Sequence, residues 1–245
     1  MEEGRSVKKT EDDWEPEPPT AKRVASRALV LSAVCFRGLI EDQPEVERAE
    51  ELRSSAESWL ESVGALEEAE PEEARILSTP LGSLSPRDAL NAGWRSEGLV
   101  ILAWALGNAA LPPIHQQCSP SDVANTLGFL GPPEEMISVA PELRADEELE
   151  HWTATYLTAH WRLRQQQVKP GVVDLEAVVA ESDWAPLTLT ELEVVDGDLA
   201  LDGSPIVDWP ENLFYLTCSI VQERHLALNW LLGFEALYSE VTTDT

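Results

Sequence analysis

The chain has 245 residues, of which 43% are hydrophobic and 25% are charged, as in an ordinary folded protein. Its 45 acidic residues against 17 Lys and Arg give a net charge of -28. Proteins that bind nucleic acid through a basic surface neutralise phosphates with Lys and Arg, so this charge argues against such a partner. It also disfavours docking on anionic lipid. The densest apolar run, residues 99–106, is far shorter than the roughly 20 residues that cross a bilayer, so no membrane association is expected.

The cysteines and the first residues predict a cytoplasmic protein with a flexible start. The three cysteines, Cys35, Cys118 and Cys218, are odd in number and form no CxxC motif, which favours a reducing compartment. Residues 1–19 are acidic and Pro-rich, unlike a signal peptide, and predict a disordered acidic tail. Residues 20–245 are then expected to form a single α-rich domain.

Capping residues and helical periodicity predict the elements of the first half of the chain. The predicted helices span about residues 20–39, 44–64, 85–107 and 119–131. The first begins at Thr20 and carries a basic face of Lys22, Arg23 and Arg27. An acidic link is expected at residues 67–73. Because the run 99–106 is apolar on every side, its helix is predicted to lie in the middle of the core.

The second half of the chain predicts three more helices and a β-hairpin. The helices span about residues 141–167, 174–183 and 210–232. Between the last two the apolar period changes to two, and the dipeptides Asp196-Gly197 and Asp202-Gly203 interrupt it, which favours a hairpin. The predicted fold class is therefore mainly α: a single-domain multi-helix bundle with one small β-hairpin before the last long helix.

Several segments resemble a known family when they are taken together and in order. They are Trp94-Arg95-Ser96-Glu97, Leu102-Ala103-Trp104-Ala105-Leu106, Arg144, His160-Trp161, and the run from Glu223 to Leu231 with the chain end after it. This combination resembles an uncharacterised bacterial family, domain of unknown function 4272, over roughly residues 20 to 245. The chain departs from the family pattern at Thr158, where an Arg is expected, and at Tyr238, where a Trp is expected. The resemblance implies a cytoplasmic bacterial protein and no particular reaction.

Four charged residues stand beside densely apolar helix segments: Arg95, Glu97, Glu223 and Arg224. Burying a single charge is expensive, so these side chains must pair with one another or with backbone carbonyls. One interpretation is an ion-pair network that fixes the register of two helices. The other is a polar pocket in which Glu97 or Glu223 is a base and an Arg anchors an anion. The full candidate set, whether pocket or network, is Arg95, Glu97, Arg144, His160, Glu223, Arg224 and Asn229.

Motifs for metal binding and catalysis are missing from the sequence. No two of the four histidines are three or four residues apart, and the single Glu148-x-x-His151 lies in a charged run that is typical of an exposed face. We expect His160 and His225, on long helices, to be hydrogen-bonded core residues. There is no Gly-x-Ser-x-Gly nucleophile motif. The sequence therefore predicts no catalytic residue, no metal site and no cofactor.

The charge distribution favours a non-enzymatic acidic interaction or binding protein. No Lys or Arg occurs between Pro170 and Glu223, whereas residues 171–211 contain eleven acids, so we expect a basic protein as partner. Such a protein could be immunity-like, covering the basic active site of a toxin, or a mimic of an anionic ligand such as a nucleic acid. Trp184 and Trp209 are candidates for the partner contact. The alternatives are an enzyme or small-anion binder with a pocket around the four charged residues named above, and a structural subunit. The oligomeric state stays open.

Overall fold

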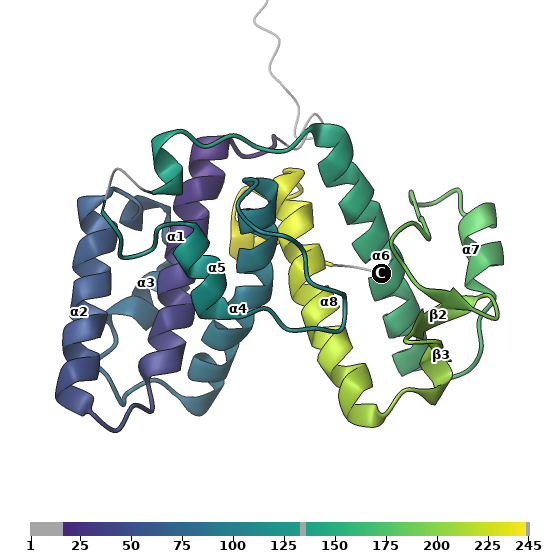
Figure 1. Cartoon of the computed structure of the whole chain (residues 1–245), viewed down its shortest axis with the longest axis horizontal. Helices are drawn as coiled ribbons and strands as arrows, with labels where there is room; N and C mark the ends of the chain where they lie inside the picture. The colour runs from purple at the N-terminus through teal and green to yellow at the C-terminus, as the bar shows by residue number, and fades with distance from the viewer. Residues whose placement is uncertain (1–16, 133–135, 244–245) are drawn as a thin grey trace, which may run out of the picture.

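A computed structural model describes residues 17–132 and 136–243. Its elements follow the chain in this order: α1 (Ala21–Ile40), α2 (Val46–Ser62), η1 (Leu66–Glu68), α3 (Pro71–Ser78), α4 (Pro86–Ala105), α5 (Pro120–Thr126), η3 (Ile137–Val139), α6 (Asp146–Val168), α7 (Leu175–Glu181), β1 (Val194–Val195), β2 (Asp198–Leu201), β3 (Ser204–Pro205), η4 (Ile206–Asp208), α8 (Glu211–Leu231) and η5 (Tyr238–Glu240). The expected mainly α fold with a small sheet before the last long helix is confirmed (Figure 1). Among the described helices, none has both the length and the apolar character needed to cross a membrane.

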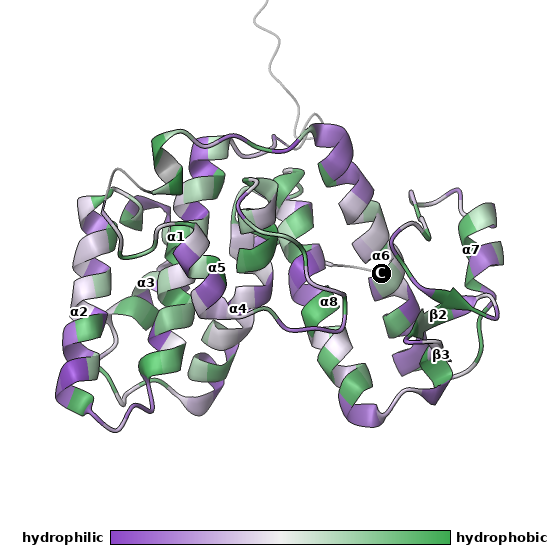
Figure 2. Ribbon diagram, in the orientation of Figure 1, coloured by the Kyte–Doolittle hydropathy of each residue, from purple (hydrophilic) through white to green (hydrophobic). Residues whose placement is uncertain are grey.

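Helix α4 lies in the centre of the molecule, as its sequence predicts. It packs between α1 and α8, while α6 covers the far side of α8 and α2 and α3 flank α1 (Figure 1). Every residue from Ser96 to Ala105 is buried. The contact with α1 is close because Gly38 has no side chain: a Cβ there would lie 2.9 Å from both the Ala89 carbonyl oxygen and the Ala92 Cβ. The hydropathy colouring shows apolar residues concentrated on these central helices (Figure 2).

The predicted acidic link at residues 67–73 is wrong, because it contains η1 and the start of α3. Pro71 occupies the first helical position of α3. The side chain of Glu73 accepts a hydrogen bond from the backbone N–H of Glu70, which completes a capping box. The helix is only eight residues long, so its apolar period is too short to stand out from its acids.

The β-structure is a three-stranded antiparallel sheet of order β1-β2-β3, one strand more than the predicted hairpin. Val194 pairs with Leu199, and Leu201 pairs with Ser204. In both turns the two central residues, Asp-Gly each time, have positive φ: 54° and 80° in the first, 50° and 78° in the second. Two-residue turns of this kind match the twist of antiparallel strands, so each Asp-Gly forms a hairpin of its own.

The packed part of the chain begins before residue 20. Residues 1–16, most of the predicted disordered tail, lie outside the described residues. Pro19 is buried. The backbone of Glu17 and Pro18 lies against Gly233, where an added Cβ would be 2.6 Å from the Glu17 carbonyl carbon.

Candidate functional site

The packing of α4 against α8 brings Glu97 and Arg224 into a buried ion pair. Both side chains are 0% exposed. The Nε and Nη2 groups of Arg224 donate to Glu97 Oε2 at 2.9 and 2.7 Å. Two oppositely charged groups this deep in the protein are stable only when their remaining hydrogen-bonding groups also find partners.

The remaining groups of this pair bind the loop between α4 and α5. Arg224 donates to four further oxygens: the carbonyls of Pro112, Pro113 and Gln116 at 2.9, 3.1 and 2.8 Å, and the Tyr156 hydroxyl at 3.0 Å. Glu97 Oε1 accepts a hydrogen bond from the backbone N–H of Cys118 at 3.0 Å. Burial opposes the charge on Arg224, but the Tyr156 and Glu97 groups beside it raise its pKa overall. The pair therefore ties α4 and α8 to this loop and, through Tyr156, to α6, and its hydrogen-bonding groups already have partners.

Arg95 and Glu223 form a second pair on the same two helices, nearer the surface. Arg95 Nη1 lies 3.3 Å from Glu223 Oε2, and the side chains are 30% and 22% exposed. Burial raises the pKa of Glu223, although Arg95 beside it acts in the opposite direction. Both residues line a polar cavity of about 360 Å³ together with Asn91, Trp94, Ser219 and Gln222. The four predicted residues are thus divided into a fully buried pair, Glu97 and Arg224, and a pair that lines this cavity, Arg95 and Glu223.

The histidines on α6 and α8 also pair. The Nδ1 atoms of His160 and His225 lie 3.0 Å apart, and both rings are buried. One ring must donate and the other accept, which requires that at least one be neutral. Burial lowers the pKa of His160 to about 4 and that of His225 to about 3. At neutral pH the two rings are therefore uncharged, and their hydrogen bond joins α6 to α8.

Arg144 and Asn229 stand apart from both ion pairs. Arg144 Nε donates to the Trp104 carbonyl oxygen at 2.7 Å, and its guanidinium lies 5.1 Å from the centre of the Trp104 ring. Its Nη1 binds Glu148, the first residue of the Glu-x-x-His motif. Asn229 Nδ2 donates to the Thr242 carbonyl oxygen at 3.1 Å. Its Oδ1 is buried and accepts no hydrogen bond from a described residue.

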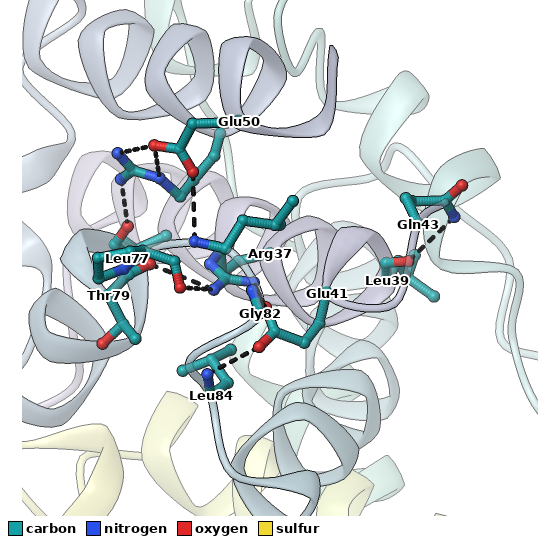
Figure 3. A network of polar contacts seen from close by, with 12 residues as sticks. Arg37, Leu39, Glu41, Gln43, Glu50, Leu77, Thr79, Gly82 and Leu84 are labelled. Carbon is teal, nitrogen blue, oxygen red and sulfur yellow. Dashed lines mark hydrogen bonds and ion pairs between the residues drawn. The ribbon is translucent and has the colours of Figure 1, made fainter. Parts of the chain in front are cut away.

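Three further arginines are buried, and the sequence predicts a core position for none of them. One of them, Arg37, binds Glu41 one helical turn later, with Nη1 2.5 Å from Oε2. Its Nη2 donates to the Thr79 carbonyl oxygen (Figure 3). The same Nη2 also donates to the Pro80 carbonyl oxygen. Glu41 in turn accepts from the backbone N–H groups of Gly82 and Leu84, at 3.1 and 2.7 Å (Figure 3). These contacts fix the loop between α3 and α4 against the end of α1.

The other two buried arginines bind acids that are distant in sequence. Arg27 pairs with Glu73 of α3 and donates to the Glu68 carbonyl oxygen at 2.8 Å, so this member of the predicted basic face lies in the core. Arg162 of α6 binds both carboxylate oxygens of Asp198 on β2, at 2.5 and 2.6 Å. For Arg27 the sequence offers one signal, the largely apolar run of residues 28–36 that follows it.

The two candidate interface tryptophans have different environments. Trp184 is 56% exposed, as an interface residue should be. Trp209 is buried, and its Nε1 donates to the Ser204 carbonyl oxygen at 2.9 Å, so its predicted exposure is wrong. In the described part of the chain, no group of three or more His, Cys, Asp and Glu residues is placed to hold a metal ion.

Comparisons with known proteins give one match. Searches of curated proteins and of solved structures found nothing that matches this chain. Residues 5–186 match the sequence profile of the family described as Domain of unknown function (DUF4272). The matched range includes α4 with Arg95 and Glu97, and it ends before α8. Since the match spans well over half of the residues, the chain belongs to the DUF4272 family.

Proposed function

We propose that the protein is a non-enzymatic, immunity-like interaction protein of the bacterial cytoplasm that captures a basic protein partner. The observation that carries the proposal is a surface formed by residues 171–211, which we name the acidic lobe. It contains eleven acids and no Lys, Arg or His. The three cysteines are free thiols, which supports a reducing compartment.

Ten of the eleven acids of the acidic lobe are exposed. They are Asp174, Glu176, Glu181, Asp183, Glu191, Glu193, Asp196, Asp202, Asp208 and Glu211. The eleventh, Asp198, is buried against Arg162. Of the ten, none forms an ion pair with another residue in the described ranges. Such a surface produces a negative field that speeds the approach of a basic partner and is screened by salt.

The acidic lobe is held to α6 by side-chain hydrogen bonds as well as by the Arg162 pair. The backbone N–H of Thr188 donates to Thr158 Oγ1 at 2.9 Å, and Thr155 Oγ1 donates to the Thr190 carbonyl oxygen at 3.3 Å. The lobe lies on the side of α6 that faces away from α8 (Figure 1). Because its surface is formed before binding, little ordering cost is expected on association. This arrangement suits a protein that covers a basic cleft.

The test compares three forms of the protein as bait at low salt. One form replaces six lobe acids with the matching amides: Glu176, Glu181, Asp183, Asp196, Asp202 and Asp208. The control replaces six exposed acids around α2 in the same way: Asp42, Glu45, Glu47, Glu51, Glu61 and Glu67. We expect one basic protein to bind the wild type and the control, to leave both in high salt, and to bind the lobe variant at least about tenfold more weakly. Equal binding by the lobe variant would refute the proposal. A basic protein encoded beside the gene is the first partner to assay.

The cavity at Arg95 and Glu223 supports a second candidate, a small-anion binder or enzyme. Its specific support is that Arg95 is partly exposed in a polar cavity. The neighbouring Glu223 carboxylate opposes anion binding, and Glu97 and Arg224 have no free face, so this candidate is the weaker one. It predicts that inorganic phosphate raises the melting temperature of the wild type and leaves that of Arg95→Ala unchanged. If the protein instead acts only by capturing a basic partner, phosphate should change the melting temperatures of the wild type and of Arg95→Ala by the same amount.

A further inference from the structure

A second cavity, of about 480 Å³, lies where α6, the end of α8 and the segment before β1 meet. Its walls are mostly apolar, and its lining includes Ala154 and Leu157 of α6 and Leu232 after α8. This volume falls within the range of small-molecule sites, which are typically apolar with a few placed polar groups. The acidic lobe contributes Trp184, Ala185 and Pro186 to the lining, but none of its acids lines the cavity, and neither does any residue of the two ion pairs.

Two aromatic side chains on this cavity are unusually exposed for their type. Trp184 is 56% exposed and Phe234 is 47% exposed. The two residues come from segments far apart in sequence. Exposed apolar surface of this kind, in a chain with a net charge of -28, is typical of a site that binds another molecule. Aromatic faces are suited to contact a flat apolar molecule.

The two polar groups that α8 contributes to the cavity are neutral, and one of them lacks a hydrogen-bond partner. Asn229 lines it and is 95% buried, yet its Oδ1 accepts no hydrogen bond from the described residues. A buried acceptor without a partner costs free energy, so this atom favours a ligand with an N–H or O–H donor. His225 also lines the cavity, and burial lowers its pKa to about 3, so it is neutral at physiological pH. Glu150 on the α6 side disfavours an anion.

We propose that this cavity binds a small, uncharged heteroaromatic molecule whose N–H donates to Asn229 Oδ1 and whose ring is held by Trp184 and Phe234. The site uses none of the acids of the lobe, so it adds a small-molecule function to the proposed capture of a basic protein. The class is defined by three features together: a flat apolar body, one donor and no negative charge.

Indole and benzothiophene are matched probes for this class. They have nearly the same size and shape, but benzothiophene has no N–H. We expect calorimetry to show saturable 1:1 binding of indole with Kd below about 1 mM, and benzothiophene to bind at least about fivefold more weakly. NMR spectra should show indole-induced shifts at the Asn229 side-chain amide. Equal affinity for the two probes, or no saturable binding of indole, would overturn the proposal.

Two surface variants distinguish indole binding in the cavity from nonspecific binding to any exposed aromatic side chain. Trp184→Ala removes a largely exposed ring, so the fold should survive and indole affinity should fall at least about tenfold. Tyr215→Ala is the control, because Tyr215 is 55% exposed on α8 and does not line the cavity. The affinity of this variant for indole should stay within about twofold of the wild-type value. An unchanged affinity for Trp184→Ala would contradict the proposal. So would a dimer of the free protein that Trp184→Ala dissociates, since a second copy would then occupy the cavity.

Discussion

The substitution Glu97→Ala tests whether the most conspicuous motif residues hold the fold together. It leaves the Arg224 guanidinium 0% exposed without its carboxylate. It also removes two N–H···O contacts, at 2.9 and 2.7 Å, and the acceptor for the Cys118 N–H. Breaking a buried ion pair by deleting one partner costs about 3–5 kcal/mol. Each kcal/mol shifts the melting temperature of a chain of this size by about 2–4 °C, so a fall of about 6–20 °C is expected.

Glu223→Ala is the matched control on the neighbouring pair. Its side chain is 22% exposed, and its single contact with Arg95 is 3.3 Å long. Pairs at the surface contribute about 0–1 kcal/mol, so this variant should lose no more than about 4 °C. The network interpretation of the sequence treats Glu97 and Glu223 alike, and the structure separates them by burial.

Glu97→Ala and Glu223→Ala are compared by thermal melt and by urea unfolding. Glu97→Leu, Arg224→Met and the double variant Glu97→Leu/Arg224→Met are compared by urea unfolding. The double variant removes both charges and replaces them with apolar groups, so it should cost at least about 1 kcal/mol less than the sum of Glu97→Leu and Arg224→Met measured singly. The m-value is the slope of the unfolding free energy against urea concentration. If it is the same in all variants, the substitutions have changed stability and not the surface exposed on unfolding. If Glu97→Ala unfolds at the same urea concentration as Glu223→Ala, the structural reading of this pair is refuted.

Three further predictions concern other buried groups. The pKa values of His160 and His225 are lower in the folded protein than in the unfolded chain, where they are about 6.5. The two rings therefore contribute their full stability above pH 6.5, and the free energy of unfolding should fall by roughly 2–4 kcal/mol by pH 5. A urea midpoint that does not change over this range would contradict their burial as neutral rings. Gly98→Ala places a Cβ against the buried hydroxyl of Tyr238, so it should cost about 1–3 kcal/mol in a thermal melt, and Gly98→Ala/Tyr238→Phe should recover part of the loss. Burial raises the pKa of every thiol, so iodoacetamide should label the native protein at pH 7.5 at least about a hundredfold more slowly than the urea-unfolded chain, at Cys35, Cys118 and Cys218 alike.

The long helices could be predicted because their signals are local. Thr20 and Ser85 accept hydrogen bonds from the backbone N–H groups of Arg23 and Asp88, three residues on, as N-caps do. The central place of α4 also follows from one stretch of sequence, since a helix that is apolar on every side needs neighbours all round. No pairing between distant residues enters either inference.

The polar core could not be predicted, because its partners lie far apart along the chain. Arg27 and Glu73 are 46 residues apart, and Glu97 and Arg224 are 127 residues apart. The sequence predicts one basic face for Lys22, Arg23 and Arg27, and only the fold shows that α3 covers Arg27. The difference in burial between Glu97 and Glu223 likewise depends on how α4 crosses α8, which no local pattern records.

The buried arginines show where functional substitutions should begin. The four buried arginines are Arg27, Arg37, Arg162 and Arg224. Each binds a carboxylate and at least one backbone carbonyl of a loop or a short helix, so each fixes a connecting segment to a long helix. Substituting such a residue leaves an unpaired charge in the core, and loss of activity would then report unfolding rather than a missing contact. The conspicuous Arg and Glu motifs are therefore poor first targets. The exposed acids of the lobe and Trp184 can be changed with little effect on stability, so a binding defect there identifies the surface that acts.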